Sequence, residues 1–127
     1  SNDILINSLK IFDEILKNSS PNKKRMLELA NTGYITATDL ADYLVKNHSM
    51  SFRKAYQKTA AVVNLAEKKK KKLDELSLDE LKKIEPKLTG DVLKVFDLTN
   101  SVNSKKSYGG TAFDNIKKMI IKYKKQK

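Results

Sequence analysis

Residues 36–45 read Thr-Ala-Thr-Asp-Leu-Ala-Asp-Tyr-Leu-Val, which is the pattern of an amphipathic helix and its first turn. Thr36 is a residue type that caps helix N-termini, and Asp39 follows it three positions later, as in a capping box. The apolar residues recur at the spacing of a single helical face. The stretch therefore predicts a helix over residues 37–47 that buries Leu40, Ala41, Leu44 and Val45.

Upstream of this stretch, the apolar spacing predicts two more helices, over residues 3–18 and 22–30. Pro21 separates them, because proline cannot continue a helix and restricts the residue before it. The longer helix carries a broad apolar stripe that consists of Ile4, Leu5, Leu9, Ile11, Phe12, Ile15 and Leu16.

Downstream, four further helices are expected, and no segment has the alternating pattern of a strand. The first begins near Ser49 or Ser51 and runs into the lysines Lys68 to Lys72; its apolar positions are Phe52, Ala55, Tyr56, Thr59, Val62, Val63 and Ala66. Ser77 and Glu80 form a capping box that opens a short helix to Ile84. Another short helix, from Thr89 or Gly90, carries Val92, Leu93 and Phe96.

After this short helix, residues 97–110 are expected to be a loop, in which Gly109-Gly110 permits a tight reversal. Thr111 is then expected to cap a last helix, whose apolar face contains Ile116, Met119, Ile120 and Tyr123. The fold class predicted for the 127 residues is all-α.

The chain is strongly basic, with a formal net charge of +11. Such a charge is typical of a protein that binds a polyanion such as nucleic acid. Nearly all of it is lysine, however, and Arg25 and Arg53 are the only arginines. Because arginine is preferred for contacts with phosphates and bases, the composition favours a lysine-rich proteome over a nucleic-acid ligand.

Three features of the composition point to the cytoplasm. The chain has no cysteine, which excludes disulfides and thiolate metal sites. It has no apolar run of the roughly 20 residues that a membrane span needs, so no membrane partner is expected. Its first residues lack the pattern of a secretory signal peptide.

Four local patterns could carry chemistry, and each has a simpler structural interpretation. Gly109-Gly110-Thr111-Ala112 lacks the spacing of a phosphate-binding loop and is interpreted as a turn with a helix cap. His48 is interpreted as a surface residue at a helix C-terminus, and Asp39 with Asp42 as a cap and its neighbour. Five consecutive lysines, Lys68 to Lys72, spread around a helix and are interpreted as a solvated helix end. No catalytic, cofactor-binding or metal-binding residue is therefore assigned.

Two separated stretches nevertheless occur together in a known family. They are residues 36–45 and the pair Asn100–Ser104 and Ser107–Ala112. Weaker blocks lie around them in a fixed order: Asn22 with Arg25-Met26, Phe52-Arg53 with Ala55, Leu65-Ala66-Glu67, Leu76-Ser77-Leu78 with Glu80-Leu81, and Asp91-Val92. Together they resemble the C-terminal region of argininosuccinate lyase, in the fumarase/aspartase superfamily. Lys105 and Phe113 depart from this pattern, since the family more often has arginine and proline there.

The resemblance implies a parent enzyme that cleaves argininosuccinate to arginine and fumarate by β-elimination, in arginine biosynthesis, without a cofactor. It implies a homotetramer whose active sites form where three subunits meet. The superfamily's catalytic loop, Gly-Ser-Ser-x-Met-Pro-x-Lys-x-Asn, is absent here; Ser19-Ser20-Pro21-Asn22-Lys23 has different spacing. The chain itself is therefore expected to be inactive and structural, with residues 3–31 from the end of a helical bundle and 32–127 forming a C-terminal helical domain.

The apolar stripe of the first helix predicts self-association, because several exposed large apolar side chains are unusual on a monomer. We expect it to pair with a second chain, most simply around a two-fold axis. The alternative function is a small basic helical module that binds nucleic acid without sequence specificity.

We predict that duplex DNA binds this chain weakly, without sequence preference, and less tightly as salt increases. Lysine charges without base-reading side chains contribute only counterion release. The measurement is a fluorescence-anisotropy titration at low and physiological salt with competitor DNA. Sub-micromolar binding to one sequence at physiological salt would favour the nucleic-acid alternative instead.

Overall fold

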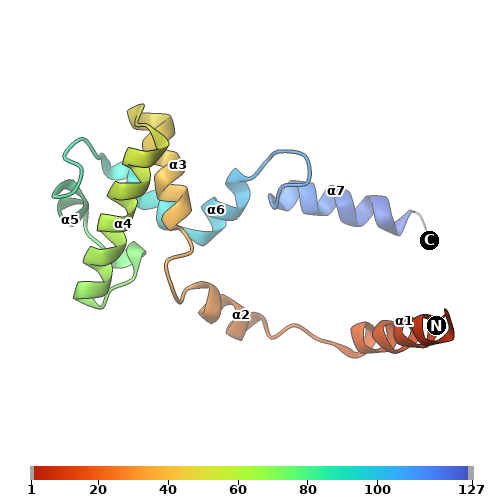
Figure 1. The fold of residues 1–127 in the computed structure, drawn as a ribbon. Helices are drawn as coiled ribbons and strands as arrows, with labels where there is room; N and C mark the ends of the chain where they lie inside the picture. The colour runs from red at the N-terminus through yellow and green to blue at the C-terminus, as the bar shows by residue number, and fades with distance from the viewer. Residues whose placement is uncertain (1, 126–127) are drawn as a thin grey trace.

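The computed structural model describes residues 2–125, all of whose regular elements are helical (Figure 1). The α-helices are α1 (Asn2–Asn18), α2 (Lys23–Ala30), α3 (Ala37–His48), α4 (Phe52–Lys69), α5 (Leu78–Lys82), α6 (Leu98–Ser104) and α7 (Phe113–Lys124). Two 3₁₀ helices, η1 (Leu73–Glu75) and η2 (Gly90–Phe96), lie between them. No strand occurs among residues 2–125, which confirms the all-α prediction.

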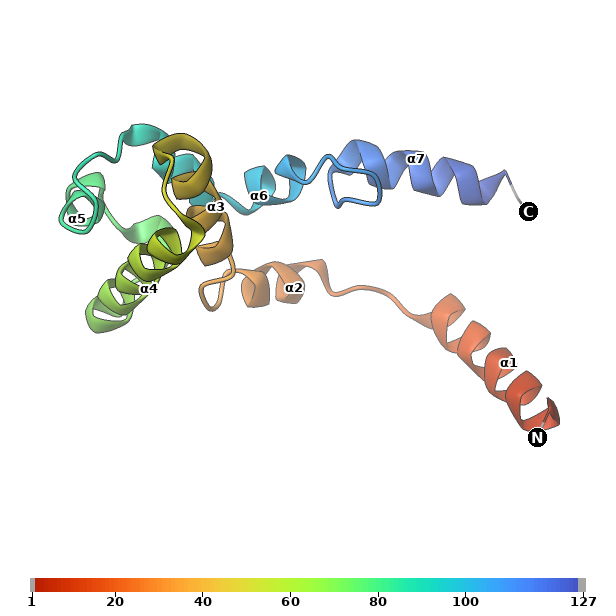
Figure 2. The same ribbon diagram turned by 45° about the horizontal axis from the view of Figure 1, so that its top comes forward.

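The molecule has a compact centre and two projecting arms (Figures 1 and 2). The centre is built from α3, α4, η1, α5 and η2. One arm consists of α2 and α1, and the other is α7, which follows α6. No residue of α1, α2, α6 or α7 is buried, and the cluster of buried apolar side chains that forms the core lies entirely in the centre.

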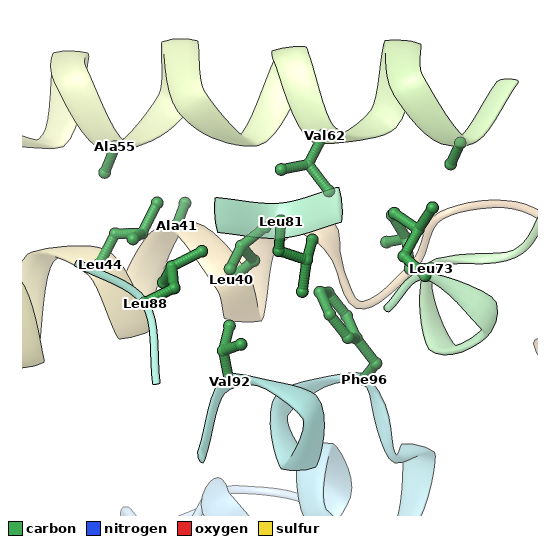
Figure 3. Close-up of a cluster of buried hydrophobic side chains, with 12 residues drawn as sticks. Leu40, Ala41, Leu44, Ala55, Val62, Leu73, Leu81, Leu88, Val92 and Phe96 are labelled. Atoms are coloured by element: carbon green, nitrogen blue, oxygen red, sulfur yellow. The ribbon is translucent and has the colours of Figure 1, made fainter. Parts of the chain in front are cut away.

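The core lies between α3, α4 and the short elements that follow them. Helix α3 turns into α4 through residues 49–51, and the two helices pack along each other. Figure 3 shows Ala55 and Val62 of α4 pointing toward Leu40 and Leu44 of α3, with Val92 below them. Burying one such leucine or valine stabilises the fold by about 1.5–3 kcal/mol relative to leaving it exposed. The largest of the almost completely buried side chains are Leu40, Leu44, Val62, Leu81, Leu88 and Val92.

The starts of α3 and α4 both follow the sequence prediction, with Thr36 and Ser51 at the N-cap positions, but the side-chain bonds expected at the start of α3 are missing. The Ser51 hydroxyl accepts a hydrogen bond from the Lys54 amide at 3.4 Å, so Ser51 is the N-cap of α4. The buried side chain of Thr36 makes no such bond to α3, and the predicted capping box with Asp39 is wrong. Of the apolar positions predicted for this helix, Phe52 and Tyr56 lie on the outer side of α4 and are 64% and 63% exposed.

The capping box at α5 is confirmed. Ser77 donates its amide to the Glu80 carboxylate at 2.8 Å, and the Glu80 amide donates to the Ser77 hydroxyl at 3.3 Å. The same carboxylate accepts the Lys69 ammonium at 2.5 Å and lies 3.5 Å from that of Lys71. These contacts, the Lys69 bond first, lower the pKa of Glu80 to about 2.

The lysine run therefore differs from its prediction as a solvated helix end. Helix α4 ends inside the run, where Lys70 adopts a left-handed conformation with φ of 52°. Lys69 and Lys71 then reach Glu80 from either side of this reversal. Two of the five lysines thus form ion pairs that connect the end of α4 to the start of α5.

The short helix expected from Thr89 or Gly90 is present, and the segment after it is more helical than predicted. The segment from Gly90 is a 3₁₀ helix that buries Val92 and Phe96 but leaves Leu93 42% exposed. The prediction of a loop over 97–110 is wrong in its first half, because Leu98–Ser104 form α6. Asp97 caps it by accepting the Asn100 amide at 2.7 Å. Its threonine, serines and asparagines favour helices little, so local preference obscured this helix.

We predict that Glu80 makes the stability of the fold depend on pH in acid. Because its pKa is about 2 in the folded chain and about 4.5 in the unfolded one, its contribution is complete above pH 4.5 and is lost as pH falls toward 2. Urea unfolding of the unsubstituted chain and of the Glu80→Gln variant should therefore give a difference in unfolding free energy that shrinks as the pH falls across this range. Asp79→Asn, on the exposed side of the same helix, is the control. A difference that is constant from pH 7 to 2 would contradict this assignment.

Candidate functional site

The Asp39 carboxylate, on the first turn of α3, makes the side-chain contacts that span the longest stretch of the described sequence. Its side chain is only 12% exposed. One oxygen accepts the Ser101 hydroxyl at 2.5 Å, and the other accepts the Lys105 ammonium at 2.5 Å. Ser101 lies in α6 and Lys105 directly follows it. One carboxylate thus joins α3 to residues 62 and 66 positions further along the chain.

An open pocket of about 180 Å³ lies beside this cluster, between α3 and α6. Asp42, Tyr43 and Lys46 of α3 line it together with the Asp39 cluster. The pocket contains charges of both signs, but its buried carboxylate already has two partners. It therefore has the chemistry of a satisfied structural contact.

Lys105 cannot serve as a base or a nucleophile in this setting. Its hydrogen bond to Asp39 raises its pKa above the ordinary 10.5, against the smaller opposite effect of burial. The negative charges of Asp39 and Asp42 act in the same direction as the hydrogen bond. The ammonium therefore stays protonated at neutral pH, and a neutral amine would be needed for either role.

The cluster continues into a folded loop that sets the start of α7. The Lys105 carbonyl accepts the Ala112 amide at 3.2 Å, which closes the loop, and Gly109 has a φ of 76°. A Cβ on Gly110 would lie 2.2 Å from the Lys105 carbonyl oxygen, so only glycine fits there. The expected reversal at Gly109-Gly110 is confirmed, with the positive φ at the first glycine only.

The first turn of α7 is capped from α6. The Asn103 side-chain oxygen accepts the Phe113 amide at 3.3 Å, and Asn115 donates to the Ser107 carbonyl at 2.8 Å. Thr111 does not cap the helix, and that prediction is wrong; its hydroxyl instead lies 3.5 Å from the Val102 carbonyl oxygen. The direction of α7 is thus determined by hydrogen bonds that lead back through α6 to Asp39.

His48 lies closer to the core than predicted. It is partly buried, its ring centroid is 5.5 Å from that of Tyr43, and its Nε2 atom has no hydrogen-bond partner among the described residues. Across residues 2–125, no group of three histidine or acidic side chains is placed to hold a metal ion.

The Asp39–Ser101 bond joins the two stretches that carried the family resemblance, residues 36–45 and the pair 100–104 and 107–112. The family model described as "Argininosuccinate lyase C-terminal" matches residues 34–103, which is more than half of the chain. The chain belongs to this family. The match includes α3, the core and α6, and thus both sides of the Asp39–Ser101 contact.

Individual relatives agree with the family model. The chain is 76% identical, over 98% of its length, to argininosuccinate lyase of Pelagibacter ubique. It is 48% identical over 89% of its length to the enzyme of Nitratiruptor, and 45% identical over 85% to that of Ehrlichia chaffeensis. It spans only 27%, 24% and 23% of these three relatives, so it corresponds to their C-terminal part.

The expected division into a bundle segment, residues 3–31, and a C-terminal helical domain, residues 32–127, stays a prediction. Residues 126 and 127 lie outside the part of the chain that the structure describes. None of the helices in residues 2–125 combines the length and the hydropathy that crossing a bilayer requires. Sequence reasoning missed Ser101, Lys105 and Asn103 as positioning residues. In the sequence, Ser101 and Asn103 stood out only because they belong to a block of residues that resembles the family. Lys105 stood out only because it departs from the family pattern. Neither observation indicates a contact with Asp39.

We predict that Asp39→Asn destabilises the fold by about 1–3 kcal/mol, because it removes a carboxylate that is only 12% exposed and accepts bonds from both Ser101 and Lys105. The measurement is the free energy of urea unfolding at pH 7. Asp42→Asn is the matched control, since Asp42 lines the same pocket but is exposed. A double-mutant cycle with Lys105→Met isolates the pair. Equal stability of the two aspartate variants would remove Asp39 as an anchor.

Proposed function

We propose that this chain is the C-terminal part of an argininosuccinate lyase whose complete form cleaves argininosuccinate to arginine and fumarate by β-elimination. The observation that carries the proposal is the 76% identity to the Pelagibacter ubique enzyme over nearly the whole chain. The same proposal includes a role in arginine biosynthesis, a cytoplasmic location, a homotetrameric parent and no cofactor.

Within that enzyme we propose a structural role for these residues. The catalytic loop of the superfamily is absent from the sequence, and Ser19 and Ser20 lie in an exposed linker between α1 and α2. Ser101 has a carboxylate partner but no histidine, and Lys105 is held protonated. No nucleophile, base and orienting group therefore stand together in the described part, and the isolated chain is expected to be inactive.

The proposal also covers partners. The exposed apolar stripe of α1 supports self-association, since seven of its large apolar side chains are 54–72% exposed. In the parent, α1 is proposed to be covered by helices of the same and neighbouring subunits. The chain is proposed to bind neither a specific nucleic-acid sequence nor a membrane.

We predict that a chimera of the Pelagibacter ubique enzyme, with its matching quarter replaced by this chain, releases fumarate from argininosuccinate. Its kcat/KM should lie within about tenfold of the relative's, a loss below about 1.4 kcal/mol, because a structural domain of 76% identity preserves the site. The measurement is the rise in fumarate absorbance. The isolated chain should give none.

Two controls accompany this experiment. The relative without its matching quarter tests whether the segment is needed at all. Replacing Ser101 by alanine in the chimera should lower the free energy of unfolding. It should change kcat/KM less, because Ser101 is proposed to have a structural role. A chimera that assembles like the relative but releases no fumarate, or fumarate release by the isolated chain, would contradict the proposed function.

A further inference from the structure

Residues 98–124, which comprise α6, the closed loop and α7, contribute no side chain to the folded core. We call this segment the α6–α7 unit. Neither the buried apolar cluster nor the half-buried apolar side chains packed against it include a residue of the unit. Its one buried residue, Ala112, lies in the loop and outside that cluster. Burial in the core therefore does not hold the unit against the centre.

The α6–α7 unit is hydrogen-bonded to itself. The Asn103 side chain of α6 accepts the Phe113 amide of α7 at 3.3 Å. From the other side, Asn115 of α7 donates to the Ser107 carbonyl of the loop at 2.8 Å. The loop itself is closed by a backbone bond to the Lys105 carbonyl. Helix α6, the loop and the start of α7 thus hold one another without help from the core.

The Asp39 carboxylate supplies the long-range hydrogen bonds between the unit and the centre. Ser101 and Lys105 each donate to it at 2.5 Å, and we call these two bonds the latch. The Asp39 side chain is only 12% exposed, whereas that of Lys105 is 44% exposed, so the latch lies at the edge of the centre. Hydrogen bonds to an ionised group are stronger than neutral ones, and both are lost when α6 moves away from α3.

The chain passes from the centre to the unit through a single residue. Asp97 follows the end of η2 and precedes α6, with an extended φ of −74° and ψ of 122°. Among the described residues, one side-chain bond other than the latch crosses this position, from the exposed Asn100 to the Lys94 carbonyl at 3.3 Å. A few residues at the ends of elements can absorb the backbone change of a hinge. Asp97 is therefore the place where the unit can turn once the latch opens.

We propose that the α6–α7 unit swings as one body about Asp97, and that the latch on Asp39 decides whether α7 keeps its direction from the centre or is released. Opening the latch leaves the core folded, because the unit contributes nothing to it. It also leaves α7 fixed relative to α6, because the bonds between them lie inside the unit. The amphipathic helix α7 is then redirected without being unfolded. Every contact involved lies within the described chain, so the experiment can fail while the proposed lyase function stands.

The test measures distances between two spin labels in the full chain by pulsed electron paramagnetic resonance. Because the sequence has no cysteine, labels attach only at introduced ones, and each labelled chain combines two of Gln57→Cys on α4, Thr99→Cys on α6 and Lys122→Cys on α7. All three positions are exposed. Gln57 with Lys122 is the centre–α7 pair, and Thr99 with Lys122 is the unit pair. An excess of unlabelled chain ensures that only distances within one chain contribute.

Both pairs should give one narrow distance distribution while Asp39 is intact. Asp39→Ala removes both bonds of the latch and should raise the open fraction by about a hundredfold or more. The centre–α7 pair should then become broad while the unit pair stays narrow. Asp42→Ala, in the same pocket, is the matched control and should change neither pair. Gly110→Ala should broaden the unit pair, because its Cβ would lie 2.2 Å from the Lys105 carbonyl oxygen of the closed loop.

Three results would overturn the proposal. A centre–α7 pair that stays narrow in Asp39→Ala would remove Asp39 as the latch, and a unit pair that broadens with it would exclude movement as one body. A centre–α7 pair that is already broad in the unsubstituted chain would show that α7 is not held. Circular dichroism and amide hydrogen exchange of α3 and α4 check that the core stays folded. If Asp39→Ala loses the core, Lys105→Met opens the latch from its more exposed partner, and the same results decide.

Discussion

The carboxylate of Asp39 is the contact on which the arrangement of the second half of the chain depends. It is nearly buried on α3, and it receives both a hydroxyl and an ammonium from α6 and its end. A buried carboxylate without partners is costly, so the segment that brings Ser101 and Lys105 is held where it can satisfy it. The position of α6 then determines the closed loop and, through Asn103, the first turn of α7.

A second carboxylate, that of Glu80, joins two elements of the centre. Glu80 accepts bonds from the start of its own helix and from lysines at the end of α4. Each carboxylate lies where one helix meets another segment, 9–11 residues away for Glu80 and 62–66 for Asp39, while the apolar cluster supplies the burial energy. The apolar contacts favour compactness, and the two polar contacts select which ends lie together.

Outside this centre, the described part of the chain leaves large apolar side chains exposed. The apolar faces of α1 and α7 remain open, although both helices are amphipathic and therefore suited to burial. Helices of this length are marginal in water unless another surface covers them. The relatives are about four times longer than the chain, and their remaining parts are one source of such surfaces in a complete enzyme.

Much of the core followed from the sequence because helical periodicity and capping are local properties. The spacing of Leu40, Ala41 and Leu44 placed them on the buried face of α3, and Ser77 with Glu80 marked the start of α5. Periodicity gives a face but not its neighbour, so it could not tell that Phe52 and Tyr56 would lie outside while Ala55 lay inside.

The candidate site was decided by tertiary structure. Asp39 was interpreted as a local cap, and the segment of Ser101 was interpreted as a loop because its residues favour helices weakly. Only the folded chain brings them within 2.5 Å, across 62 residues, and that contact outweighs local preference. The sequence by itself determined the helical class, most of the core and the family. The tertiary structure decided the partners of the charged side chains and the direction of α7, because pairing between distant residues depends on how the helices pack.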